Sequence, residues 1–262
     1  MIPTFRRPHT LPEAIGSALA QEGVDGEVVV VDDDPQRSAE PVVQALREPR
    51  VRYVPMESTS QARPAKVRNV GLAIASASLV HFLDDDDRVS PGAYAALASA
   101  LDGDPRASMA FGTVEPFGGD AAALQHERDY FARGTRMLRL VGRPGLRPFL
   151  LASLLYTQAP LVCSAALFRR DHLLALHGFN PAIAVCEDID LFVRAARRSG
   201  ARFVDRAVLQ YRVGAPSLAH GHRSAALASS DYREIQRVYR ETHGALEALS
   251  LKLIARTALR FA

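Results

Sequence analysis

The chain has 262 residues, of which 48% are hydrophobic and 23% are charged, so a disordered protein is excluded and a large core is expected. The net charge of +3 and the pI near 9.1 favour anionic small molecules or lipids as partners, whereas no basic stripe with interleaved aromatic residues indicates nucleic acid. The two cysteines, Cys163 and Cys186, exclude a disulfide scaffold and indicate a reducing compartment.

No targeting or membrane-spanning segment is expected. Residues 2–7 lack the apolar region of a signal peptide, and the longest apolar stretch, 148–168, is interrupted by Gln158 and Pro160. These features predict a cytoplasmic protein.

The first hundred residues predict alternating helices and strands. Thr10 and Glu13 form a capping-box pattern that predicts a helix from residue 11. Ser90 and Pro91 predict the cap and first residue of a helix that ends near residue 101. Strands are expected at 28–31, 51–54 and 79–83 and from residue 109, and further helices at 42–46 and 65–77.

The pattern is looser in the second half of the chain. An arginine-rich segment, 133–147, is predicted to form a loop or lid. Beyond it we expect a strand at 161–168, helices at 169–177 and 187–198, an edge strand at 203–211, and two helices over 224–262. Alternating strands and helices predict an α/β fold with parallel strands, in which ligands bind beyond the carboxyl ends of the strands.

Four consecutive aspartates, 84–87, directly follow the predicted strand 79–83. Adjacent carboxylates repel one another, whereas their oxygen atoms suit Mg²⁺ or Mn²⁺ and, through the metal, a phosphate. Side chains two residues apart in an extended segment point to the same side, so Asp84 and Asp86 are expected to face one way together. The alternative for such a cluster is a solvated acidic turn.

A second acidic cluster, 32–34, follows the strand 28–31, where a carboxylate can accept a hydrogen bond from a base or a ribose. The alternative is a turn before Pro35. In the segment 61–69, Arg63 can pair with a phosphate or stack on a base, or it can be a solvated residue at a helix start. Further along, Glu187 and Asp188 begin a predicted helix. There a carboxylate can serve as a general base, or the two acids can simply complement the helix dipole.

The order of these elements resembles that of the family 2 glycosyltransferases of GT-A fold, over roughly residues 1–212. The resemblance depends on motifs at residues 2–7, Gln21, 28–33, 65–72 with Arg68-Asn69-x-Gly71, 82–87 with Pro91, 166–170, 178–179 and 187–194. The family usually has several more apolar residues before Ile-Pro-Thr, so either the first strand is short or the native start lies upstream of Met1.

The resemblance implies a GT-A domain over residues 1–212 and a C-terminal helical extension over 213–262. The GT-A domain would hold a Rossmann-like, mostly parallel central sheet flanked by helices. Its nucleotide-binding half would be 1–110 and its acceptor-binding half 111–212.

For the nucleotide-sugar donor, the resemblance implies contacts by four residues of the first half. Pro3 and Thr4 would line the nucleotide pocket, and Asp33 would read the base, uracil in a UDP-linked donor, with Arg63 nearby.

For the reaction, the resemblance implies that Asp84 and Asp85 contact the ribose and the sugar. Asp86, in a DXD motif, would bind the divalent metal, Mn²⁺ or Mg²⁺. Asp188 would be the catalytic base that deprotonates an acceptor hydroxyl, and the product would be inverted at the anomeric carbon.

Other activities and partners stay open. A nucleotidyltransferase on a related fold would be expected to have a glycine-rich loop near the N-terminus, which the sequence lacks; a non-catalytic nucleotide-binding paralogue is the other alternative. The acceptor would be a saccharide or a lipid-linked molecule. Residues 249–262 could make a peripheral contact with the inner face of the membrane, pack as a helix, or form a homodimer contact.

Overall fold

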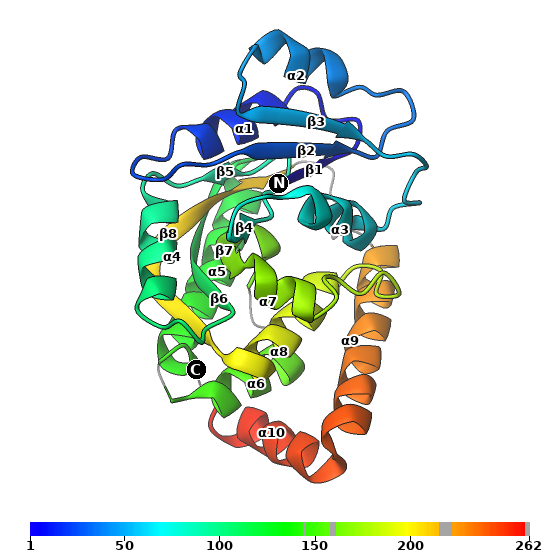
Figure 1. The fold of residues 1–262 in the computed structure, drawn as a ribbon. Helices are drawn as coiled ribbons and strands as arrows, with labels where there is room; N and C mark the ends of the chain where they lie inside the picture. Colours follow the sequence, from blue (N-terminus) through cyan, green and yellow to red (C-terminus); the bar gives the residue numbers. More distant parts are fainter. Residues whose placement is uncertain (144, 158–160, 215–221, 260–262) are drawn as a thin grey trace.

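The computed structural model describes residues 1–143, 145–157, 161–214 and 222–259 and has an α/β architecture (Figure 1). The first half contains β1 (Ile2–Thr4), α1 (Leu11–Leu19), β2 (Val28–Asp32), α2 (Glu40–Leu46), β3 (Val51–Pro55), α3 (Pro64–Ile74), β4 (Leu79–His81), β5 (Arg88–Val89) and α4 (Ala93–Asp102). The second half contains β6 (Met109–Gly118), α5 (Ala121–Val141), α6 (Arg147–Tyr156), a short 3₁₀ helix (Cys163–Ala165), β7 (Ala166–Arg169), α7 (Arg170–Ala175), α8 (Glu187–Ser199), β8 (Ala201–Val213), α9 (His222–His243) and α10 (Ala245–Thr257).

The strands β1, β2 and β3 form a parallel sheet with β2 in the centre. Every residue of β2 is buried, as expected of an apolar strand covered on both faces. In this register Thr4 lies beside Asp32, so the carboxyl ends of β1 and β2 meet at one edge. In parallel sheets ligands bind beyond the carboxyl ends of the strands, so the ends of β1 and β2 lie where a ligand is expected.

A second sheet has the strand order β4-β7-β6-β8-β5 and is mixed, because β6 and β8 are parallel and the other pairs are antiparallel. The two sheets are joined at β1 and β4. The amino group of Met1 donates to the carbonyl of His81 at 2.7 Å, and the amide of Leu83 donates to the carbonyl of Met1 at 3.0 Å. This junction fixes the aspartate segment beside the end of β1.

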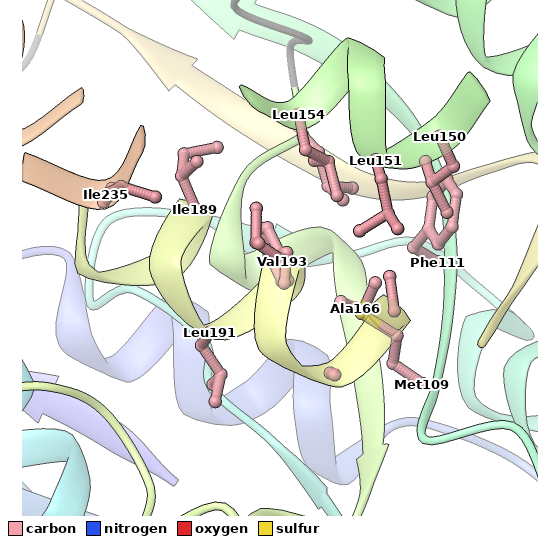
Figure 2. Close-up of a cluster of buried hydrophobic side chains, with 14 of the residues drawn as sticks. Met109, Phe111, Leu150, Leu151, Leu154, Ala166, Ile189, Leu191, Val193 and Ile235 are labelled. Atoms are coloured by element: carbon pink, nitrogen blue, oxygen red, sulfur yellow. The ribbon is translucent and has the colours of Figure 1, made fainter. Parts of the chain in front are cut away.

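Helices bury the apolar faces of the sheets. In Figure 1, α1 and α2 cover the parallel sheet, whereas α10 lies at the opposite end of the molecule. Figure 2 shows the core beneath the second sheet, where Ile189 and Val193 of α8 face Leu151 and Leu154 of α6. Ile235 of α9 belongs to the same buried cluster, so the C-terminal helices share the core of the preceding domain.

Two predicted helix caps are wrong, although both helices exist. Thr10 makes no side-chain cap, and the Glu13 carboxylate pairs with Arg88 and Arg212 from distant elements, because two cations bind it better than a backbone amide does. The helix predicted from Pro91 begins at Ala93, after Gly92 in the left-handed conformation (φ +69°).

The arginine-rich segment is not a loop or lid in the described residues, because α5 and α6 cover most of it. Gly134 is buried within α5 and does not interrupt it, whereas Gly142 is the residue at which α5 ends, and a side chain there would meet the Cβ of Phe203 at 2.5 Å. The predicted strand 161–168 is strand only from Ala166, after a 3₁₀ turn.

The strand predicted at 203–211 is longer than expected and is not an edge strand, because β8 pairs with both β6 and β5. Two C-terminal helices are present as predicted, with residues 260–262 outside the described part. No helix of the described residues has the length and apolar content needed to span a membrane. The division at residues 110 and 212 stays a prediction.

Candidate active site

The four aspartates alternate in exposure, although they lie in a turn and not in the extended segment that the sequence predicted. Asp84 and Asp86 are partly exposed, whereas Asp85 and Asp87 are buried. The amide of Asp87 donates to the carbonyl of Asp84 at 3.2 Å, which closes a turn directly after β4. The turn thus gathers the four carboxylates at one place, with Asp84 and Asp86 more accessible than Asp85 and Asp87.

The buried pair is held by groups from other elements. Asp85 accepts a hydrogen bond from the Thr4 hydroxyl at 2.7 Å, and Asp87 accepts one from the backbone amide of Arg212 at 2.9 Å. Arg7 donates to both Asp85 and Asp86, at 3.0 and 2.5 Å. Burial, with repulsion from Asp84, raises the pKa of Asp86 to about 6.

The carboxylates of the second acidic cluster, residues 32–34, also differ in their surroundings. The Asp32 carboxylate is used by the fold, since it accepts hydrogen bonds from two backbone amides and from the Tyr53 hydroxyl. Asp33 is held at the end of β2 by Ser60, whose amide and hydroxyl each donate at 2.5 Å. Asp33 keeps acceptor capacity, because a carboxylate has about four lone-pair positions.

The turn that brings Ser60 to Asp33 has a strained backbone. Gln61 and Ala62 both have positive φ, at +60° and +58°, and the Arg63 amide then donates to the Ser60 hydroxyl at 3.1 Å. The guanidinium of Arg63 donates to the carbonyl of Ala182 at 3.2 Å. Such strain is concentrated at functional sites, where the surrounding structure compensates for it.

Arg68 joins the aspartate segment to the first turn of α8. Its guanidinium donates to Asp84 at 2.7 Å and also pairs with the buried carboxylate of Glu187. Arg68 is itself 6% exposed, so solvent screens its ion pair with Glu187 only weakly. Because Asp188 follows Glu187, this bridge holds the predicted base and the DXD segment at one site.

Burial raises the pKa values of both Glu187 and Asp188, and Arg68 opposes this change. Asp84 adds to the upward shift at each carboxyl. A carboxylate with a raised pKa is a stronger base at neutral pH than an ordinary aspartate.

The loop before α8 is fixed by the remaining motif residues. Asn69 makes two hydrogen bonds to the backbone of Phe179, each at 2.8 Å. Arg194 of α8 donates to the carbonyl of Gly178 at 2.8 Å and pairs with Asp190. The motif residues of α3 and α8 therefore act together on one loop.

The site residues predicted from the sequence form two neighbouring groups. Pro3, Thr4 and Asp33 lie at the ends of β1 and β2, with Arg63 at the start of α3. Thr4 contacts Asp85 directly, and Arg68 connects Asp84 to the helix that bears Asp188. The geometry brings these residues to one region; their individual roles stay predictions.

Sequence reasoning gave no role to several supporting residues. Arg7, Ser60 and Arg68 make the contacts described above, and the Ser164 hydroxyl accepts a hydrogen bond from the Asp84 amide at 3.0 Å. Arg7 and Arg68 belong to motifs that the resemblance used, so a role could have been assigned to them. Ser60 lies in an irregular segment that carries no periodic signal, and Ser164 lies in the 3₁₀ helix within the segment predicted as a strand.

Within the described residues, no group of three or more Asp, Glu, His or Cys side chains is arranged to hold a metal ion by itself. A Mg²⁺ or Mn²⁺ site on Asp86 still fits, because such ions bind through one or two carboxylates together with substrate phosphates. The crowded carboxylates and the raised pKa of Asp86 suit an added cation.

Comparisons with known proteins agree with this geometry. The profile of Glycosyl transferase family 2 matches residues 1–175. The succinoglycan biosynthesis protein ExoU of Rhizobium meliloti is 30% identical over 264 residues, which cover 96% of this chain and 70% of ExoU. A GalNAc(5)-diNAcBac-PP-undecaprenol beta-1,3-glucosyltransferase of Campylobacter jejuni is 37% identical over 99 residues, or 37% of this chain and 32% of the relative.

Among solved structures, S. aureus TarS 1-349 in complex with UDP-GlcNAc has a TM-score of 0.66 at 18% identity, covering 95% of this chain and 68% of that chain. This likeness confirms the GT-A fold. Three of the matched curated relatives are longer, and the chain spans only 26% to 63% of their lengths. The family profile and the match to ExoU show that the chain belongs to glycosyl transferase family 2.

Proposed function

We propose that the protein moves a sugar from a nucleotide diphosphate sugar, UDP-linked, to an acceptor hydroxyl with inversion at the anomeric carbon. The observation that carries the proposal is the bridge from Asp84 through Arg68 to Glu187, next to Asp188. It joins a donor-binding strand end to a candidate base in a family 2 chain. The product would belong to a glycan, polysaccharide or glycoconjugate.

For the donor, Pro3 and Thr4 would contact the nucleotide and Asp33 would accept a hydrogen bond from uracil. Arg63 lies within the same turn as Ser60, the residue that holds Asp33. The UDP-GlcNAc complex of TarS, a protein of related fold, supports a UDP-linked donor.

Asp84 and Asp85 would hold the ribose and the sugar, and Asp86 would bind Mn²⁺ or Mg²⁺. When bound, the ion would offset the negative charge of the departing diphosphate. Arg7 already neutralises part of the carboxylate charge at Asp85 and Asp86.

Asp188 would accept the proton of the acceptor hydroxyl as that oxygen attacks the anomeric carbon. The bond from the anomeric carbon to the phosphate oxygen breaks, and UDP leaves from the opposite side, which inverts the configuration. A raised pKa makes the carboxylate a better proton acceptor, and its place in the first turn of α8 keeps it within the electrostatic influence of Asp84.

The test is donor turnover by the wild type and by Asp188→Asn, with Glu241→Gln on the exposed face of α9 as the matched control. We expect Asp188→Asn to lower kcat by at least a hundredfold with UDP binding unchanged, and EDTA to abolish turnover until Mn²⁺ or Mg²⁺ is restored. Unchanged turnover in Asp188→Asn would refute the base assignment. Release of pyrophosphate from a nucleoside triphosphate would instead indicate a nucleotidyltransferase, and UDP binding without turnover a non-catalytic paralogue.

For the acceptor we propose a lipid-linked saccharide, met at an anionic membrane surface through α10. Leu246, Leu249 and Leu253 lie on one face of α10 and are 83%, 64% and 61% exposed. The exposed residues of this helix include Lys252 and Arg256 but no acid, since Glu247 is only partly exposed and pairs with Arg197. Exposed leucines beside cations suit an anionic bilayer. The undecaprenol-linked acceptor in the name of the Campylobacter relative supports this choice.

Flotation with vesicles of anionic lipid tests the membrane contact. The double variant Leu249→Asp/Leu253→Asp should lose flotation, whereas Leu174→Asp, at a 42% exposed leucine of α7, should keep it. Equal flotation of the two variants would exclude the contact. A wild type that does not float and forms a dimer that the double variant disrupts would identify the face as a homodimer contact.

A further inference from the structure

A buried carboxylate on the C-terminal helix α9 holds the segment that leads into α8. One oxygen of Asp231 accepts hydrogen bonds from three successive backbone amides, those of Ala184, Val185 and Cys186, at 3.0, 2.7 and 3.2 Å. Asp231 is 8% exposed. Burying a carboxylate is costly unless hydrogen bonds compensate, so these three amides account for its place in the core.

The segment that Asp231 holds ends where the candidate base begins. Cys186 is the residue before α8, and it makes no side-chain cap for the helix. Asp188 follows two residues later. On the other side, the segment is anchored by Asn69 and Arg194 at residues 178–179. Residues 180–186 are thus tethered at both ends, and α9 supplies the tether nearer to the base.

We propose that Asp231 is a positioning residue for Asp188. By fixing the amides of residues 184–186, it keeps the first turn of α8 at its distance from the aspartate segment. The inference rests on the proposed function, since it assigns the C-terminal extension a part in the transfer reaction. Because a displacement of about 1 Å at a reacting group can lower a rate about a hundredfold, the loss of one tether should affect catalysis strongly.

The experiment compares Asp231→Ala, Asp231→Asn and a matched control, Gln236→Ala. Gln236 lies on the same helix, where its side-chain amide donates to the carbonyl of Leu155 at 2.7 Å. The control therefore weakens the attachment of α9 to α6 without touching residues 184–186. Donor turnover, UDP affinity, thermal stability and hydrogen exchange of the three amides are measured for each variant.

We expect Asp231→Ala to lower kcat about a hundredfold and to speed exchange of the amides of residues 184–186, with the affinity for UDP unchanged within about twofold. Asp231→Asn keeps one carbonyl acceptor and should recover part of the rate. Gln236→Ala should lose stability but keep kcat within about threefold.

Equal losses of kcat in Asp231→Ala and Gln236→Ala, or a parallel loss of UDP affinity, would overturn the inference. Unchanged exchange of the three amides in Asp231→Ala would also overturn it. A wild type that transfers no sugar from any donor would instead refute the proposed function, and the tether would then be judged by exchange alone.

Discussion

Substituting Gly178 by alanine tests whether the loop before α8 is held as described. Gly178 has a φ of +65°, and an added Cβ would lie 2.4 Å from the Asn69 side-chain oxygen. That oxygen accepts the hydrogen bond from the Phe179 amide. Gly178→Ala should therefore introduce backbone strain and displace Asn69 from the loop.

The backbone strain and the lost hydrogen bond can be separated with a control variant. A side chain in the left-handed conformation costs about 1–2 kcal/mol. Loss of the bond to the Phe179 amide adds roughly 1–3 kcal/mol, because a partly buried donor is left without its acceptor. The free energy of unfolding should fall by about 3 kcal/mol in total. Gly23→Ala is the matched control, since Gly23 has a φ of +73° with nothing within 4 Å of an added Cβ.

Urea unfolding followed by circular dichroism measures both variants. Gly178→Ala should be about 2 kcal/mol less stable than Gly23→Ala, which corresponds to roughly 4–8 °C in Tm for a chain of this size. In an Asn69→Ala background most of the excess should disappear, because the closest atom is gone and the end of the Leu72 side chain, at 3.2 Å, can shift. Equal destabilisation by the two glycine substitutions in the wild-type background would refute the reasoning.

Three further predictions concern titration. Burial lowers the pKa of His81 to about 4. Between pH 6.5 and pH 4 the histidine is therefore protonated in the unfolded state but neutral in the folded state. Stability should fall by about 3 kcal/mol from pH 6.5 to 4, and His81→Gln should flatten this dependence in urea titrations; identical slopes would contradict the account. Burial raises the pKa values of Cys163 and Cys186, the latter to about 12, so a thiol reagent at pH 8 should label neither until the protein unfolds. Rapid labelling of the folded chain would count against their burial. As the proposed base, Asp188 would act only when deprotonated; because burial raises its pKa, kcat/KM should fall about tenfold per pH unit below that pKa, and a flat profile would argue against it as the base.

The sequence predicted the strands and helices that carry strong local patterns. The strand β2, with its β-branched run, and the helix α8, with its acidic start, both follow from periodicity and charge. The family resemblance supplied the pairing of the DXD segment with Asp188, which no local pattern contains.

The errors arise where tertiary contacts override local chemistry. Glu13 does not form the predicted capping box, because its carboxylate pairs with Arg88 and Arg212, which are distant in sequence. The helices α5 and α6 were not predicted because glycine usually marks a turn, whereas Gly134 here is buried inside α5. Asp231 could not be assigned a role, since its three partners lie 45 to 47 residues away in sequence.

The tether from α9 has a consequence for engineering acceptor preference. Chimeras between family members are usually joined between units that look separate along the sequence, and a junction after β8 looks suitable here. Such a junction would pair the 184–186 segment of one parent with the α9 of another, and three amides would lose their acceptor wherever that α9 has no acid in the place of Asp231. Exchanges that carry residues 180–190 and α9 together should yield folded hybrids more often than exchanges of the C-terminal helices alone.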